Sequence, residues 1–318
     1  MDKNLLLDCY RTMLLIRRFE DEAARCYTER HIGGFLHLYS GQEAVSTGVI
    51  KALDLQKDYI ISGYRDHGHY LSAGGDPNAA MAELFGKATG CAGGRGGSMH
   101  FFDSSHHFLG GYGIVGAQLP IAAGVAFAAK YRNTDSVTVC FLGDGAVSIG
   151  PFHEALCLCA LWNLPIIFVV ENNRYSMGTP LSRTMVTEDA SLRALGYPME
   201  YDLVDSCDVV DIFNAATKAI TRARTESKPT LLECKTYRYR GHSMADPGKY
   251  RSKEEVEQWK RQDPILLAQL RIEKDFSHLS PQLSNISQLI EQQINEALHF
   301  AHQSPEPSPN SLMDFTYV

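Results

Sequence analysis

The sequence predicts an α/β protein with a central, mostly parallel sheet flanked by helices. Residues 137–142 and 166–170 are short apolar runs with the composition of buried strands. The segment between them opens with Gly150-Pro151 and reads as a helix. A strand, a helix and a second strand in this order form a parallel βαβ unit. Both strand ends therefore fall at the carboxyl edge of the sheet, where open α/β sheets bind their ligands.

Oxygen-bearing side chains follow both of these strands. Residues 143–146 read Gly-Asp-Gly-Ala, and residues 171–175 read Glu-Asn-Asn-Arg-Tyr, which places Asp144 and Asn173 side by side. A carboxylate, an amide oxygen and a nearby backbone carbonyl suit Mg²⁺, which takes its other ligands from phosphates and water. The glycines around Asp144 allow backbone N–H groups to approach an anion. A lone Gly-Asp-Gly is more typical of a turn, but the whole arrangement predicts a metal–diphosphate clamp.

Composition excludes several classes of protein. The 318 residues suit one large α/β domain or two small ones, with 44% hydrophobic and 21% charged residues. A net charge of −7 argues against a nucleic-acid surface. No apolar run approaches the ~20 residues that span a bilayer. The eight scattered cysteines indicate reduced thiols. The N-terminus lacks the pattern of a signal or transit peptide, which predicts a bacterial-type cytoplasmic protein.

The N-terminal part begins with an amphipathic helix over residues 2–31, and a second helix runs from the turn at Ser40-Gly41 to Leu53. His37 lies in the loop before that turn. The strand that starts at residue 59 ends in a polar cluster with Tyr64 and Arg65, and a guanidinium can fork onto phosphate oxygens. The nearby His67 and His69 could suggest a metal site. Because no third nitrogen or thiolate ligand is placed beside them, we expect local hydrogen bonds instead.

Two glycine-rich segments resemble nucleotide-binding motifs, but neither satisfies the requirements of such a motif. Residues 90–98 lack the Gly-Lys-Ser/Thr ending of a P-loop. Residues 111–117 match Gly-x-Gly-x-x-Gly/Ala, but they follow a polar run, and Asp135 precedes a strand where a dinucleotide site needs an acid at a strand end. The following helix is rich in alanine, so neighbouring backbones can approach it. It suits either packing within its own domain or a subunit contact.

The C-terminal half continues the α/β pattern. A strand is expected over residues 201–204, an amphipathic helix over 208–226 and a buried strand over 229–234, followed by a basic, histidine-bearing loop over 237–243. A further helix starts at Asp263-Pro264 and the last covers residues 282–303. We expect a principal domain over residues 1–265, and a helical extension and tail over 266–318.

Seven segments taken together resemble one protein family. They keep the order and spacing found in the alpha subunits of the thiamine diphosphate-dependent 2-oxo acid dehydrogenases, nearest to the pyruvate dehydrogenases, over residues 5–265. The resemblance implies a thiamine diphosphate-binding fold for the principal domain. The segments are residues 35–44, 64–65, 96–100, 113–118, 143–146, 171–178 and 237–248.

The resemblance also implies roles for individual residues. Asp144, Asn173 and the carbonyl of Tyr175 would hold Mg²⁺, and the backbone of Gly113 and Val115 would bind the aminopyrimidine ring. His242 is in addition a candidate catalytic residue in acyl transfer. Ser243 matches a serine that animal relatives phosphorylate, but the next segment lacks a second family serine, so we do not expect kinase regulation. The residues implied around the diphosphate are His37, Tyr64, Arg65, Gly145, Ala146 and His242.

The implied activity is the oxidative decarboxylation of pyruvate, with thiamine diphosphate and Mg²⁺ as cofactors. The acetyl group would pass to a lipoyl domain of a dihydrolipoyl acyltransferase. A beta subunit, in an α2β2 heterotetramer, would supply the activating glutamate and much of the substrate wall. Acetoin and branched-chain 2-oxo acid dehydrogenases stay open as alternatives, because the specificity pocket is shared with that partner. A non-catalytic assembly subunit would have no need of Asp144 and Asn173.

Overall fold

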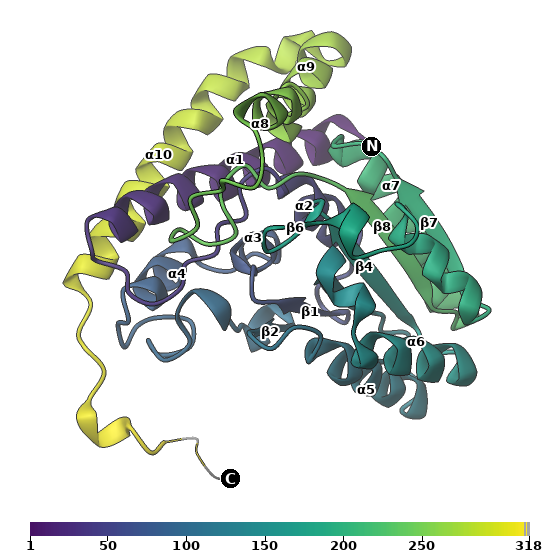
Figure 1. The fold of residues 1–318 in the computed structure, drawn as a ribbon. Coiled ribbons are helices and arrows are strands. Elements are labelled where there is room, and N and C mark those ends of the chain that lie inside the picture. The colour runs from purple at the N-terminus through teal and green to yellow at the C-terminus, as the bar shows by residue number, and fades with distance from the viewer. Residues whose placement is uncertain (315, 317–318) are drawn as a thin grey trace.

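Six parallel strands form the central sheet of the computed structural model, which describes residues 1–314 and 316 (Figure 1). The strand order is β2-β1-β3-β4-β8-β7. The predicted α/β fold is confirmed, and so is the β3–helix–β4 unit. The strands are β1 (Tyr59–Gly63), β2 (Phe108–Tyr112), β3 (Thr138–Gly143), β4 (Ile166–Asn172), β7 (Glu200–Val204) and β8 (Thr230–Lys235), and a small separate hairpin consists of β5 (Tyr175–Ser176) and β6 (Thr179–Pro180).

Helices cover both faces of the sheet, which explains why its central strands are apolar throughout. Along β3, Val139 and Phe141 face one hydrophobic cluster, whereas Cys140 and Leu142 face the other. The first face is covered by α1 (Lys3–Thr28), α2 (Glu43–Ile50), α3 (His67–Ser72), α4 (Pro77–Leu84), α7 (Val209–Glu226), α9 (Pro264–Asp275) and α10 (Ser280–Gln303), and the second by α5 (Gln118–Tyr131) and α6 (Gly150–Trp162). The short α8 (Lys253–Lys260) has no buried residue.

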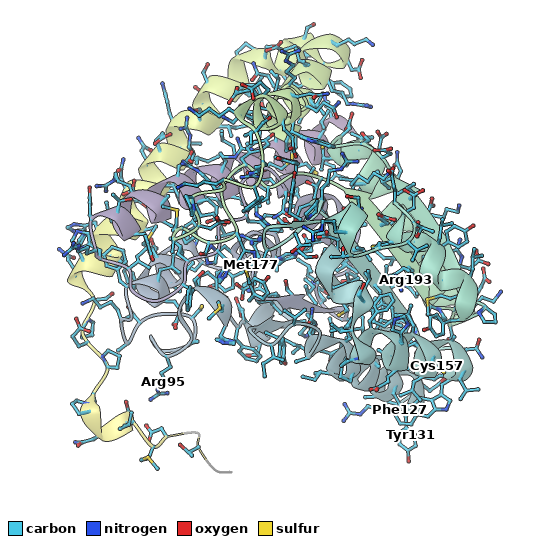
Figure 2. All side chains as sticks on the ribbon, in the orientation of Figure 1. Arg95, Phe127, Tyr131, Cys157, Met177 and Arg193 are labelled. Atoms are coloured by element: carbon cyan, nitrogen blue, oxygen red, sulfur yellow. The ribbon has the colours of Figure 1, made fainter. Side chains whose placement is uncertain are left out.

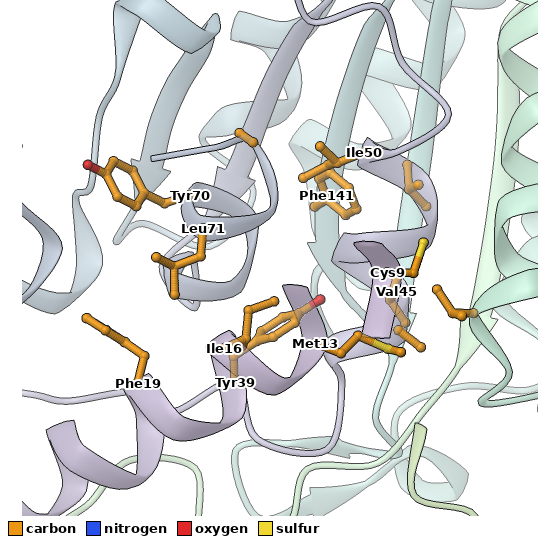
Figure 3. Close-up of a cluster of buried hydrophobic side chains, with 14 of the residues drawn as sticks. Cys9, Met13, Ile16, Phe19, Tyr39, Val45, Ile50, Tyr70, Leu71 and Phe141 are labelled. Atoms are coloured by element: carbon orange, nitrogen blue, oxygen red, sulfur yellow. The ribbon is translucent and has the colours of Figure 1, made fainter. Parts of the chain in front are cut away.

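The larger hydrophobic cluster joins the two ends of the chain. Figure 3 shows Met13, Ile16 and Phe19 of α1 in the same buried cluster as residues of α2, α3 and β3. Ala268 and Ile290 of the C-terminal helices belong to the same cluster. The expected boundary at residue 265 lies within α9, so the division into a principal domain and an extension stays a prediction. No helix in the described part of the chain is long and apolar enough to cross a membrane.

One strand of the central sheet, β2, was not predicted from the sequence. β2 has the sequence Phe-Leu-Gly-Gly-Tyr, whose adjacent glycines disfavour a strand. The expectation that Gly113 follows only a polar run is therefore wrong, because Gly113 comes directly after β2. The second argument against a dinucleotide site stands. Asp135 precedes β3, and its carboxylate lies 2.6 Å from Lys57 Nζ at the opposite edge of the sheet.

The ring nitrogens of the two neighbouring histidines contact polar side chains of the protein. The nitrogens of His67 contact Glu20 at 3.0 Å and the hydroxyl of Ser98 at 3.0 Å. Nε2 of His69 lies 3.1 Å from Glu171. Among the described residues no group of three or more His, Cys, Asp or Glu side chains is placed to bind a metal. The expectation of local hydrogen bonds is confirmed, and both residues are buried in α3.

The first glycine-rich segment folds around a carboxylate of its own chain. Glu83 is fully buried at the end of α4. One carboxylate oxygen accepts the N–H groups of Ala92 and Gly94, each at 2.8 Å, and the other accepts those of Gly96 and Gly97 at 2.8 and 3.0 Å. These donors are occupied, which explains in physical terms why the segment is no phosphate-binding loop.

Candidate active site

A cavity of about 490 Å³ opens at the carboxyl edge of the sheet. Its walls come from the ends of β1, β2, β3 and β4 and from the loop after β8. The structure brings every predicted site residue to this one cavity: His37, Tyr64, Arg65, Gly113, Val115, Asp144, Gly145, Ala146, Asn173, Tyr175 and His242.

The three predicted metal ligands lie at the ends of adjacent strands. β3 and β4 pair in parallel with Gly143 opposite Glu171, and Asp144 follows directly. Asp144 is 2% exposed, and its Oδ2 atom has no hydrogen-bond partner among the described residues. Burial raises the pKa of this carboxyl group to about 6, against the opposing charge of Arg238. A buried carboxylate oxygen without a hydrogen-bond partner is a suitable ligand for a cation.

The two histidines of the site form an aromatic group with Tyr64. The ring centroids of His37 and His242 are 5.2 Å apart, and the Tyr64 ring lies 4.7 Å from that of His37. Burial, followed by the charge of Arg65, lowers the pKa of His37 to about 3 and that of His242 to about 4. Both rings are therefore neutral at neutral pH, and the Nδ1 atom of each has no hydrogen-bond partner in the described part of the chain. A bound anion would favour their protonated forms.

Arg65 is buried against the backbone and does not point freely into the cavity. It donates to the carbonyl oxygens of Leu38 at 2.6 Å and His242 at 2.8 Å. Burial, with the charge of Arg238, lowers its pKa to about 10. Only the Arg65 N–H groups that do not donate to these carbonyls could contact a phosphate. The phosphate contact of Arg65 stays a prediction.

Arg238 is a cavity residue that the sequence did not single out. Its side chain is 1% exposed, and no described carboxylate lies within ion-pair distance. Nη1 lies 3.4 Å from Oδ1 of Asn173 and 3.3 Å from the carbonyl oxygen of Tyr175, and Nη2 donates to the carbonyl of Met177 at 2.9 Å. A buried cation held only by neutral oxygens indicates that an anion belongs nearby. The sequence feature that could have identified Arg238 is its place in a basic run three residues after the end of β8.

Comparison with known proteins identifies the family. The family described as dehydrogenase E1 component matches residues 11–310. The chain belongs to the dehydrogenase E1 component family. It is 44% identical to the pyruvate dehydrogenase E1 component subunit alpha of Rickettsia felis, over 99% of this chain and 96% of the relative. Identity to the subunits of the same name is 46% in Zymomonas mobilis (98% and 88% covered) and 44% in Porphyra purpurea (100% and 94% covered).

The predicted family and enzyme class are thereby confirmed. An E1 component implies thiamine diphosphate as cofactor, and the cavity of this E1 chain fits such a ligand. Its lining combines apolar walls with buried polar atoms that have no hydrogen-bond partner among the residues that the structure describes. Those atoms are Nδ1 of His37 and His242, Nε2 of Gln42, Oδ2 of Asp144 and Oγ of Ser176.

The loop that carries His242 in this E1 chain is held by a polar network. Asp246 accepts the His242 N–H at 2.6 Å, the Tyr250 hydroxyl at 2.8 Å and the Gly248 N–H at 2.8 Å. Tyr250 also accepts from Arg238 at 2.8 Å. The histidine is thus positioned through the same arginine that contacts the predicted metal ligands.

The cavity of the E1 chain is incomplete on the side of Gly113. Val115 is 47% exposed and Ile114 is 77% exposed. Beyond them, α5 buries Leu119 and Ala122 but leaves Phe127 and Tyr131 in solvent, as Figure 2 shows at the end of that helix. The expected packing within the domain is confirmed for one face of this helix. The other face presents apolar side chains, and the subunit contact stays a prediction.

Proposed function

We propose that the chain is the alpha subunit of a pyruvate dehydrogenase E1 component, which decarboxylates pyruvate oxidatively and passes the acetyl group to a lipoyl domain of an acyltransferase. One observation carries this proposal. Asp144, Asn173 and Tyr175 bring a carboxylate, an amide and a carbonyl to one buried cavity. The names of the full-length relatives support pyruvate over acetoin or a branched-chain 2-oxo acid. We include a bacterial-type cytoplasmic location in the proposal.

The same three residues would hold Mg²⁺, which prefers oxygen ligands and keeps phosphates and water in its shell. When bound, thiamine diphosphate supplies a nucleophilic carbon and an electron sink for the loss of carbon dioxide. The chain would bind and orient it: Gly113 and Val115 offer backbone groups to the aminopyrimidine. The diphosphate would be held by His37, Tyr64, Arg65, Gly145, Ala146 and His242.

His242 has a second proposed role during acyl transfer to the lipoyl group. It is half-buried at the junction of the main cavity and a second one that Phe35 and Met177 also line. With a pKa of about 4 the ring is neutral in the ligand-free chain. A bound diphosphate would favour the protonated ring, which could then donate the proton that a lipoyl sulfur takes up when the lipoyl disulfide is opened.

A beta subunit is the proposed partner that completes the site in an α2β2 heterotetramer. The exposure of Ile114 and Val115 beside the proposed aminopyrimidine position supports a covering chain. Phe127 near the end of α5 and Leu161 and Trp162 at the end of α6 are apolar side chains that are each more than a third exposed, which supports a partner chain on these helices as well. The activating glutamate would come from that subunit.

Reconstitution with a beta subunit tests the function. Calorimetric titration with thiamine diphosphate should give binding that depends on Mg²⁺, and absence of binding would favour the non-catalytic alternative. The reconstituted enzyme, offered pyruvate, 3-methyl-2-oxobutanoate and acetoin, should prefer pyruvate. A higher kcat/KM for either of the other two would overturn the substrate assignment.

Cation binding should weaken as the pH falls through about 6, the pKa of Asp144. The cation needs the ionised carboxylate, and below the pKa each pH step of one lowers the ionised fraction about tenfold. Calorimetric titration with Mn²⁺ at saturating thiamine diphosphate, from about pH 5 to pH 8, measures the effect. The affinity of Mn²⁺ for the free cofactor in the same buffers corrects for the titration of the phosphate. A corrected affinity that does not change would contradict Asp144 as a ligand.

A further inference from the structure

Gln42 lies at the cavity. It stands within the segment 35–44 that resembles the family, but the proposed ligand set does not include it. It precedes α2 at the N-cap position, but its side chain makes no capping hydrogen bond. The residue is 1% exposed and lines the same cavity as Asp144 and Asn173. A buried amide must place both its oxygen and its N–H group, so its partners are informative.

The backbone around Gln42 is fixed from two sides. Glu43 is fully buried, lies 2.5 Å from Arg17 Nε, and accepts the Gly41 N–H at 3.0 Å. Gly41 has φ +98°, and a Cβ there would lie 2.2 Å from the carbonyl oxygen of Tyr237, so only glycine fits this turn. The Gln42 side chain therefore starts from a rigid position.

The oxygen of the Gln42 amide controls the orientation of Asn173. Oε1 of Gln42 accepts the Nδ2 group of Asn173 at 3.0 Å. With its nitrogen engaged there, Asn173 directs Oδ1 to the opposite side, where Arg238 Nη1 lies at 3.4 Å and the N–H of Tyr175 also at 3.4 Å. An amide rotated the other way would present N–H groups to a cation and repel it.

The nitrogen of the Gln42 amide is left without a partner. Nε2 is buried and makes no hydrogen bond to any described residue, and the same is true of Oδ2 of Asp144. A buried donor without an acceptor is unfavourable, because it has lost its bonds to water without replacing them. Gln42 and Asp144 thus offer the cavity a free donor and a free anionic acceptor that do not bond to each other. A ligand carrying both an acceptor oxygen and a cation satisfies the two at once, and a metal-bound diphosphate is such a ligand.

We propose that Gln42 is a further residue of the metal–diphosphate site. Its carbonyl oxygen positions Asn173 with the amide oxygen toward the cation, and its N–H group donates to an oxygen of the diphosphate. This inference rests on the proposed function, because it assigns Gln42 to the cofactor proposed there.

Two substitutions separate the two parts of this role. Gln42→Ala removes both amide groups. Gln42→Glu has nearly the same shape and keeps an acceptor for Asn173, but it replaces the donor with a charged oxygen facing the diphosphate. Gln56→Ala is the matched control, since Gln56 is exposed shortly after α2. All variants are reconstituted with the beta subunit and titrated calorimetrically with thiamine diphosphate at saturating Mg²⁺. The thermal midpoint of each cofactor-free protein is measured alongside.

Gln42→Ala should weaken cofactor binding about 10–100-fold, as removal of a ligand-orienting group does at metal sites. Gln42→Glu should bind at least as poorly, although it keeps the acceptor for Asn173. Burial of the new carboxylate should lower the thermal midpoint of its cofactor-free protein. Binding is therefore compared at a temperature at which every variant is folded, which separates a role in binding from one in folding. Gln56→Ala should bind normally. Affinities within about twofold of the unsubstituted protein in both Gln42 variants would overturn this inference alone. No binding by the unsubstituted protein would overturn the proposed function and this inference with it.

Discussion

Replacing Asp144 with asparagine should abolish Mg²⁺-dependent binding of thiamine diphosphate and at the same time stabilise the cofactor-free protein. The substitution removes the only carboxylate of the proposed ligand set. It also removes a buried charge, because burial raises the pKa of Asp144 from 3.8 to about 6. A folded-state pKa above the unfolded value means that the native state favours the protonated form. Stability therefore falls as the pH rises from about 4 to 6, by roughly 3 kcal/mol in total.

Thermal unfolding of the cofactor-free protein between about pH 4 and pH 8 measures this effect. The midpoint of Asp144→Asn should exceed that of the unsubstituted protein above pH 6 and match it near pH 4. Asp275→Asn, at an exposed position, should change neither the midpoint nor cofactor binding. A variant that still binds thiamine diphosphate in a Mg²⁺-dependent manner would remove Asp144 from the ligand set.

Replacing Glu83 with glutamine should destabilise the protein by about 3–5 kcal/mol. The carboxylate accepts four backbone N–H groups, two on each oxygen. Glutamine presents an amide N–H₂ to one of these pairs, which leaves two buried donors without an acceptor. Differential scanning calorimetry of the reconstituted complex should show the alpha-chain transition about 6–15 °C lower.

The exposed Glu188 supplies the matched substitution Glu188→Gln, which should leave the transition unchanged. A Glu83→Gln transition within about 2 °C of the unsubstituted protein would mean that the loop finds other acceptors. The carboxylate would then not be what holds residues 90–97.

The sequence located the site because the necessary information was local. An apolar run that stops at Asp144 and another that stops before Asn173 fix two strand ends, and a parallel connection brings them together. The roles of these residues stay predictions, but their convergence on one cavity follows from strand order alone. The sequence did not predict β2, because its two adjacent glycines have no preference for a strand. Pairing with β1 determines its conformation instead.

Gln42 and Arg238 could not be found in this way. The contact of Gln42 with Asn173 spans 131 positions of the sequence, and that of Arg238 with Met177 spans 61. Neither follows from spacing or periodicity, because it depends on how loops cross the sheet edge. The glycine-rich segment 90–98 is a further case in which the sequence did not reveal a long-range contact. The missing lysine ruled out a nucleotide site, but only the fold reveals that Glu83, from the preceding helix, occupies the glycine-rich segment.

The hydrogen bonds between Glu83 and the glycine-rich segment determine at which stage the segment loses its conformational entropy. Glycine loses more backbone entropy on ordering than any other residue. Here residues 90–97 are ordered by a carboxylate of the same chain, so that entropy is lost during folding. Ser98 follows directly, and its hydroxyl accepts the N–H of His37 at 3.2 Å. The cavity wall at His37 thus rests on a loop already immobile before any ligand arrives, and ligand affinity is not reduced by the need to order it.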